Sequence, residues 1–219
     1  EIEKIKKACE ITDKCFSHIL KYIKPGMTEK QIAKEIEEYY NKRAEGVSFE
    51  TIVASGENSS KPHAIPTDRK IENRDIITID MGCKVDGYCS DMTRTIFVGE
   101  PTDEMKYVYD IVLKNQKIVL EEYKDGASTR QLSKMIESNF KIDNFSLIHG
   151  LGHGVGLEIH ETPFINDRYD GVLKENMVVT DEPGIYIPGK FGIRIEDTVQ
   201  ITKIGCIKLT NSEKNYIII

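Results

Sequence analysis

Residues 77–99 read ITIDMGCKVDGYCSDMTRTIFVG, and two acids in this stretch, Asp80 and Asp91, stand among apolar neighbours. The β-branched run at residues 76–79 leads into Asp80, which is typical of a strand buried on both faces of a sheet. A buried carboxylate costs free energy unless a cation or a metal ion pairs with it. The stretch therefore predicts a buried strand whose acid has a partner.

A turn signal, Val85-Asp86-Gly87, divides this stretch. The chain should reverse there and send residues 88–97 back alongside as a second strand. Asp91 would then lie roughly opposite the start of the first strand and face Asp80 across the hairpin. Two interpretations fit such a pair of acids: an ion pair with Arg94, or a metal site. The hairpin alone does not separate them.

A second copy of the same pattern lies 100 residues further along the chain. Residues 24–40, KPGMTEKQIAKEIEEYY, align without a gap with residues 124–140, KDGASTRQLSKMIESNF. Further on, ENRDIITIDMG in the first half resembles ENMVVTDEPG in the second. An internal repeat of this kind predicts one structural unit built twice. We therefore expect a single domain, residues 1–219, made of two helix-helix-hairpin halves at about 1–98 and 99–219.

The repeat also aligns the acids of the two halves. With a gap of one residue Asp80 falls on Glu182, and Asp91 falls on Glu196. If the halves pack about a pseudo-twofold axis, these four carboxylates converge, and like charges at close range need cations between them. Oxygen-rich sites suit manganese, magnesium or calcium, and one imidazole moves the preference toward transition metals. The repeat thus favours the metal site.

Composition excludes several classes of protein. The net charge is −6 and no basic run stands out, which argues against nucleic acid as a partner. No apolar run approaches the length of a membrane span, and the N-terminal segment is charged and amphipathic rather than a signal peptide. Five cysteines without a CxxC pair suggest reduced thiols and a cytoplasmic location.

Helical spacing and caps define the outer layer. An apolar stripe over residues 2–23 ends at Pro25-Gly26, and Thr28 with Gln31 forms a capping box for a second helix. The corresponding helix of the second half should begin after Ser128. Strands are predicted at 49–54, 76–80, 88–97, 145–148, 177–182, 185–187, 192–200 and 206–210. Helix pairs covering a central, mostly antiparallel sheet make the predicted class α+β.

Residues 149–163, HGLGHGVGLEIHETP, combine a glycine-rich run with three of the five histidines. The glycines allow close backbone approach. The stretch is neither a phosphate-binding fingerprint nor an HExxH helix, because Pro163 follows His160-Glu161 too closely. Another histidine, His63, lies in a polar loop at residues 55–68, where binding residues concentrate.

Five motifs in this order resemble the catalytic domain of Xaa-Pro aminopeptidases and prolidases, which are relatives of methionine aminopeptidase. The motifs are SGENSSKPH, DMGCKVDGYCSDMTRT, HGLGHGVGLEIHE, DEPGIY and GIRIED. The resemblance covers essentially the whole chain. It implies the pita-bread fold, in which two pseudo-twofold-related halves enclose a pair of metal ions.

The resemblance also implies the metal ligands and the ions. Asp91 and Glu196 would bridge two divalent cations, Asp80 would complete one of them, and His153 with Glu182 would complete the other. Manganese is the expected metal, with cobalt or zinc as alternatives.

Further residues would act on the substrate. The resemblance implies that His63 lies near the substrate, that His149 and His160 hold the scissile carbonyl, and that Tyr186 is an additional donor. Glu182 would shuttle the proton, and Arg194 would orient the acids. Asp181, beside Glu182, is an acid without an evident role, and strand alternation predicts that it points away from the site.

The leading functional expectation is an Xaa-Pro aminopeptidase, acting on a peptide with proline at its second position. The alternative is an Xaa-Pro dipeptidase (prolidase). A different class is an inactive pita-bread module that binds peptides or histones, and creatinase-type hydrolysis is a further possibility. Proteins of these two kinds lack some of the metal ligands, whereas all five ligand residues are present in this sequence. Relatives usually carry an N-terminal domain, so we expect one outside this sequence, or a homo-oligomer.

Overall fold

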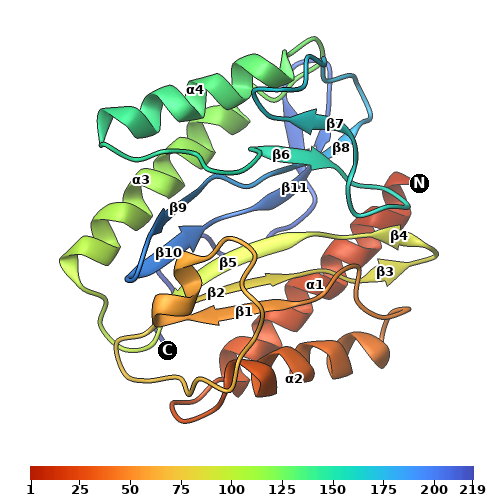
Figure 1. Cartoon of the computed structure of the whole chain (residues 1–219). Coiled ribbons are helices and arrows are strands. Elements are labelled where there is room, and N and C mark those ends of the chain that lie inside the picture. The colour runs from red at the N-terminus through yellow and green to blue at the C-terminus, as the bar shows by residue number, and fades with distance from the viewer.

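The computed structural model describes all residues, 1–219. Two helices, α1 (Ile2–Tyr22) and α2 (Glu29–Asn41), precede the strands of the first half. Two more, α3 (Asp103–Leu120) and α4 (Thr129–Ile142), precede those of the second half. The four helices lie outside the strands (Figure 1). No helix combines the length and apolar character needed to cross a lipid bilayer.

The strands form two main antiparallel sheets. The first has the order β1 (Ile52–Ser55), β2 (Ile76–Met81) and β5 (Met92–Phe97). The second has the order β12 (Cys206–Lys208), β11 (Asp197–Ile201), β8 (Val178–Asp181), β6 (Gly152–Gly154) and β7 (Glu161–Ile165). Two short hairpins complete the strand set, β3 (Lys84–Val85) with β4 (Tyr88–Cys89), and β9 (Gly184–Ile187) with β10 (Phe191–Arg194).

The two sheets meet at the ends of the strands that carry the acids. The Glu196 backbone N–H donates to the Thr93 carbonyl at 3.1 Å, which joins the entry of β11 to β5. Figure 1 shows β5, β10 and β11 side by side in the middle of the molecule. Helix pairs over antiparallel strands confirm the predicted α+β class.

The helix starts follow the predicted caps. The Thr28 side chain accepts from the Gln31 backbone, and the Gln31 side chain accepts from the Thr28 backbone, so the capping box is present. Ser128 caps α4 by accepting from the Gln131 backbone. Each helix has one apolar face for the core, and burial of those faces supplies most of the stabilisation.

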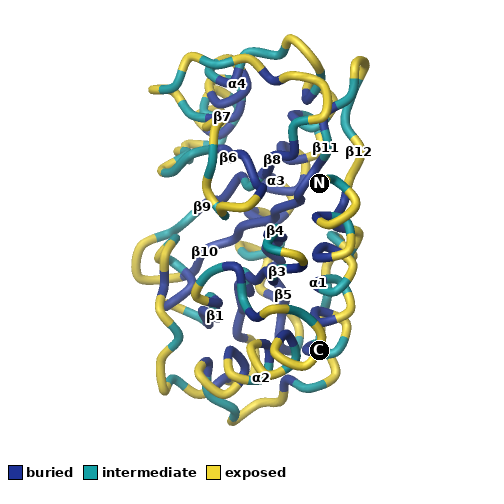
Figure 2. Tube along the Cα trace, turned by 90° about the vertical axis from the view of Figure 1, so that its right-hand side faces the viewer, coloured by how far each residue is buried: buried dark blue, intermediate teal, exposed yellow.

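Each helix pair covers its own core. One apolar cluster lies between α1, α2 and the first sheet and includes Phe16, Ile36 and Ile79. The other lies between α3, α4 and the second sheet and includes Val112 and Val199. In Figure 2 the central strands are buried, whereas β12, the loops and the outer helix faces carry exposed residues. The order of helix, helix and strands thus occurs twice, while superposition of 1–98 on 99–219 stays a prediction.

The hairpin reverses as predicted, but the position expected for Asp91 is wrong. Asp86 and Gly87 have φ of 49° and 81°, the positive values that a tight two-residue turn requires. The register pairs Asp80 with Thr93, so Asp91 lies just beyond the far end of β2, not opposite its start. The reason is the turn itself, because with Asp86 and Gly87 as its two central residues Val85 pairs with Tyr88, and the same register continued along the strands pairs Asp80 with Thr93. A Cβ at Gly82 would lie 1.9 Å from the Ser90 carbonyl oxygen, so only glycine permits the close approach of these two chain segments.

Other strand predictions also needed correction. Residues 145–148 form no strand, because the Phe145 N–H bonds back to the Phe140 carbonyl at the end of α4. Residues 161–165 form β7, which the sequence analysis did not predict. The predicted strand 192–200 is divided at residues 195–196, where the chain passes from the β9–β10 hairpin into the second sheet.

Candidate active site

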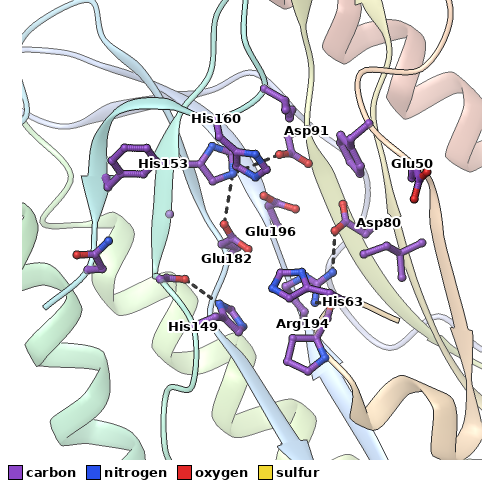
Figure 3. Close-up of a pocket in the computed structure, with 18 residues that line it drawn as sticks. Glu50, His63, Asp80, Asp91, His149, His153, His160, Glu182, Arg194 and Glu196 are labelled. Carbon is purple, nitrogen blue, oxygen red and sulfur yellow. Dashed lines mark hydrogen bonds and ion pairs between the residues drawn. The ribbon is translucent and has the colours of Figure 1, made fainter. Parts of the chain in front are cut away.

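A cavity of about 430 Å³ opens between the two sheets. Nine of the ten predicted site residues line it: His63, Asp80, Asp91, His149, His153, His160, Glu182, Arg194 and Glu196. The tenth, Tyr186, is not among the lining residues but hydrogen-bonds to two of them, His149 and Arg194. Figure 3 shows the acids and histidines pointing into this space from both halves of the chain.

The acids come from strand ends, where neighbouring strands approach each other. Asp80 is on β2, Asp91 precedes β5, Glu182 follows β8 and Glu196 precedes β11. His153 is on β6, which lies close against β8. A Cβ at Gly152 would lie 2.1 Å from the Thr180 carbonyl oxygen, so the glycine beside His153 is required for this approach.

Three of these residues meet closely enough to hold a metal ion. Possible ligand atoms of Asp91, His153 and Glu196 all lie within 4.8 Å of one another, and all three residues are buried. His153 Nε2 is 3.5 Å from Asp91 Oδ2 and 3.5 Å from Glu182 Oε1. Its Nδ1 donates to the Gly154 carbonyl at 3.0 Å, so in the neutral ring Nε2 carries the lone pair.

Electrostatics show that this cluster suits cations. Burial and the neighbouring carboxylates raise the pKa values of Asp91 and Glu196 well above their ordinary range. Burial also raises the pKa of Glu182 to about 7, with a further increase from Asp80. Burial lowers the pKa of His153. Asp80 Oδ1 is buried without a hydrogen-bond partner. Unpaired oxygens and mutually repelling acids beside a neutral imidazole fit divalent metal ions.

Two threonines that the sequence analysis did not identify orient the acids. Thr93 donates to Glu196 Oε2 at 2.7 Å, and Thr180 Oγ1 lies 3.4 Å from Glu182 Oε1. Thr180 stands two residues before Glu182, and Thr93 two residues after Asp91. Side chains two apart on a strand share a face, so this spacing could have identified both threonines.

Arg194 links several parts of the site. Its guanidinium donates to Asp80 Oδ2 at 2.7 Å and to the Tyr186 hydroxyl at 2.7 Å. It also donates to Thr93 Oγ1 and to the Pro62 carbonyl, each at 3.1 Å. Because it is buried and makes four hydrogen bonds, Arg194 orients ligand side chains rather than presenting a free cation to the cavity.

His149 continues this chain of hydrogen bonds. Its Nδ1 donates to the Gly150 carbonyl at 2.7 Å, and its Nε2 is 3.0 Å from the Tyr186 hydroxyl. Burial and then Arg194 lower the pKa of His149 to about 4, so the ring is neutral near pH 7. In that state Nε2 accepts from Tyr186, which in turn accepts from Arg194.

The remaining histidines lie at the cavity mouth. His160 packs edge-on against His153 with ring centroids 4.4 Å apart, and burial followed by His153 lowers its pKa. His63 is exposed and reaches the cavity from the loop before β2. Both rings are accessible to a bound molecule.

The ion pair considered for the hairpin acids is wrong. Arg94 pairs with Asp197 at 2.7 Å and contacts neither Asp80 nor Asp91. Burial alone would favour protonated Asp197, but Arg94 and Lys214 outweigh it and lower its pKa to about 2. Asp181 does not line the cavity. It is fully buried without a hydrogen-bond partner, and burial and Asp197 raise its pKa.

Comparison with known proteins identifies a family of metallopeptidases, in agreement with the metal-ligand residues that line the cavity. The sequence profile of metallopeptidase family M24 matches residues 3–203, so the chain belongs to this family, whose pita-bread fold it has. Xaa-Pro dipeptidase of Pyrococcus furiosus is 45% identical over 221 residues, covering 99% of this chain and 63% of that protein.

Two solved structures superpose closely. Xaa-Pro dipeptidase from Bacillus anthracis matches with a TM-score of 0.98 at 43% identity, over 100% of this chain and 62% of that one. X-Pro aminopeptidase from Thermotoga maritima matches with a TM-score of 0.97 at 44% identity, over 100% of this chain and 63% of that one. The chain thus spans less than two thirds of these relatives.

The raised pKa of Glu182 predicts a pH-dependent effect of Glu182→Gln in metal-free protein. Below about pH 4.5 the carboxyl is protonated in folded and unfolded chains alike, and the substitution should change little. Between about pH 4.5 and about 7 the carboxyl ionises in the unfolded chain but stays protonated in the folded one, so the wild type loses stability across this range. At pH 8 with chelator the variant should be more stable than the wild type by about 1–3 kcal/mol.

Urea unfolding at pH 5 and pH 8 measures this difference. Divalent cation should remove the advantage of the variant, since the wild type then gains a ligand for the ion. An equal difference at both pH values would contradict the raised pKa.

Proposed function

We propose that this protein hydrolyses the peptide bond between an N-terminal residue and a following proline. The observation that carries the proposal is the meeting of Asp91, His153 and Glu196 within 4.8 Å on the wall of an open cavity. The substrate class comes from the relatives, which are named Xaa-Pro dipeptidase and X-Pro aminopeptidase. The more numerous dipeptidase names favour that alternative over the aminopeptidase expected first.

The proposed site holds two divalent cations. Five residues on the cavity wall would hold these ions as ligands: Asp80, Asp91, His153, Glu182 and Glu196. Manganese remains the proposed metal, with cobalt or zinc as alternatives, because carboxylates dominate the donor set and one imidazole is present. When bound, the ions supply Lewis acidity to the attacking water and to the substrate carbonyl.

The protein's own groups then bind the substrate and move the proton. Glu182 is the proposed shuttle, because its carboxylate lies on the cavity wall beside His153 and can take a proton from water and return it to the leaving nitrogen. His63 and His160 at the mouth would hold the peptide. His149 and Tyr186 would stabilise the charge that develops on the carbonyl oxygen. Arg194 keeps Asp80 and Tyr186 in place.

Other functional classes are less well supported. A pita-bread module that only binds peptides or histones would not need five ligand-type residues around one cavity. Creatinase-type hydrolysis would not need the full set either. Residues 1–219 are proposed to form one domain with an internal repeat, in a cytoplasmic protein whose remaining length or partner subunit shapes the substrate end. The proposed binding partner is a peptide substrate. We propose no interaction with nucleic acid or with a membrane.

A panel of small substrates tests the proposal. With manganese present, an Xaa-Pro dipeptide should be cleaved faster than an Xaa-Pro-Yaa tripeptide, and an Xaa-Ala dipeptide should be cleaved far more slowly. Preference for the tripeptide would favour the aminopeptidase instead. Tight metal binding without cleavage of any of the three would contradict the peptidase proposal.

A further inference from the structure

Glu29 is a fully buried acid that lies outside the cavity wall. It is the first residue of α2, where the helix N-terminus favours negative charge. Its carboxylate accepts five hydrogen bonds, all from neutral donors. Oε1 accepts from the Ser55 backbone at 2.6 Å and the Ser55 hydroxyl at 2.7 Å. Oε2 accepts from Asn58 Nδ2 at 2.9 Å, the Thr67 backbone at 2.8 Å and the Thr67 hydroxyl at 2.7 Å.

These donors are the two ends of a single loop. Ser55 and Asn58 begin the segment that includes the short helix η1 (Gly56–Ser60), and Thr67 ends it. Between them lies His63. One carboxylate therefore closes the base of the loop that carries a cavity histidine.

The middle of the same loop, at Ser59 and Pro62, contacts the second half of the chain. The Pro62 carbonyl accepts from Arg194 at 3.1 Å, and the Ser59 hydroxyl accepts from the Gly192 backbone at 2.9 Å. Figure 3 shows His63 beside Arg194 at one side of the cavity. Since His63 itself is exposed and has no ordered partner of its own, its position depends on how the loop is held at these two places.

The repeat provides an internal comparison. Thr129 stands 100 residues after Glu29, is also the first residue of its helix and is also fully buried. Its hydroxyl lies 3.4 Å from the Tyr169 carbonyl and 3.1 Å from the Gly171 carbonyl, and it accepts from the Gly171 backbone at 3.0 Å. Both halves thus use this position to fix a loop. Only the half with His63 in its loop uses a carboxylate there.

We propose that Glu29 is a positioning residue for His63, and this inference rests on the proposed peptidase function. Glu29 touches no substrate. It fixes both ends of residues 55–67 so that His63 faces the substrate and the Pro62 carbonyl meets Arg194. An amide at this position would turn one acceptor into a donor and set it against the donors of Ser55 or Thr67, which releases one end of the loop.

A double-mutant cycle tests this role. Glu29→Gln should lower kcat/KM for an Xaa-Pro substrate by about 10–100-fold, the size of effect that misplacement of a binding group produces. In a His63→Ala background the same substitution should cause almost no further loss, because it acts through His63. Thr28→Ala, which removes the helix cap next to Glu29, is the matched control. It should lower the melting temperature and leave kcat/KM nearly unchanged.

Independent losses in the double variant would overturn the inference, as would normal kcat/KM in Glu29→Gln. Should Glu29→Gln not fold, Thr67→Val removes one loop donor and is expected to show the same loss that disappears with His63→Ala. Hydrogen exchange of residues 55–67 gives a readout without activity. Faster exchange there in Glu29→Gln supports the role of Glu29 in fixing the loop, whatever the activity of the wild type. Absence of Xaa-Pro cleavage by the wild type would refute the peptidase proposal alone. Unchanged exchange overturns the role of Glu29 in fixing the loop.

Discussion

The Asp91→Asn variant should lose tight binding of divalent cations and keep its fold. Asp91 is buried and is surrounded by acids that raise its pKa, and its carboxylate makes no hydrogen bond that an amide would break. The substitution keeps the side-chain volume and removes one charge from a crowded cluster. Without metal the variant should therefore be at least as stable as the wild type. The affinity for manganese should fall by more than about 100-fold, beyond the loss typical of an outer hydrogen-bond partner.

Calorimetric titration with manganese and circular dichroism of the same preparation measure both effects. Asp86→Asn is the matched control. It changes an exposed acid at the turn of the same hairpin, where asparagine tolerates the φ of 49°. Tight manganese binding by Asp91→Asn would show that Asp91 is not a metal ligand. Loss of the helical signal together with the metal would show that Asp91 is also required for the fold.

The His149→Ala variant should keep its metal and lose turnover. His149 fixes the Tyr186 hydroxyl from one side while Arg194 holds it from the other, at 3.0 and 2.7 Å. Groups held where charge develops on a substrate oxygen contribute on the order of 100-fold to rate. We expect kcat to fall by about that factor with a smaller change in KM. His153→Ala should instead lose metal, because His153 Nε2 faces Asp91 and Glu182.

Tyr186→Phe separates the two possible donors. If Tyr186 donates to the substrate oxygen, its removal should lower kcat as much as His149→Ala does. If Tyr186 only holds the His149 ring in place, Tyr186→Phe should be the milder variant. Normal turnover per folded molecule in His149→Ala, with a lower melting temperature, would show that the ring only supports the strand ends.

The sequence predicted the chemistry of this site better than its geometry. The repeat and the buried setting of Asp80 were sufficient to predict a carboxylate cluster, because the repeat aligns the acids of the two halves, and like charges that converge in a core need cations among them. The caps at Thr28 and Ser128 were also readable, since capping depends on residues three apart. Nine of the ten proposed residues line one cavity. Their roles remain for the variants to test.

Tertiary structure alone decided which charges meet. Arg94 is near Asp91 in sequence but pairs with Asp197, while Asp80 pairs with Arg194 from the other half. Local spacing cannot reveal this, because Arg94 and Asp197 belong to different halves of the chain and meet only in the folded structure. The strand that contains Pro163 is also a consequence of packing, because β7 pairs with β6. The position of Asp91, by contrast, follows from the two-residue turn at Asp86-Gly87.

Glu29 shows the same limit most clearly. In the sequence it is one acid in the first turn of an amphipathic helix, where an exposed position is the ordinary expectation. Its burial and its five hydrogen bonds depend on residues 26 to 38 positions away. The sequence by itself determined the helix pairs, the buried acidic hairpin and the metal-type residue set, because these depend on local periodicity and repetition. The partners of each charge were decided by the fold, because a buried charge is stabilised only by the groups that packing brings to it.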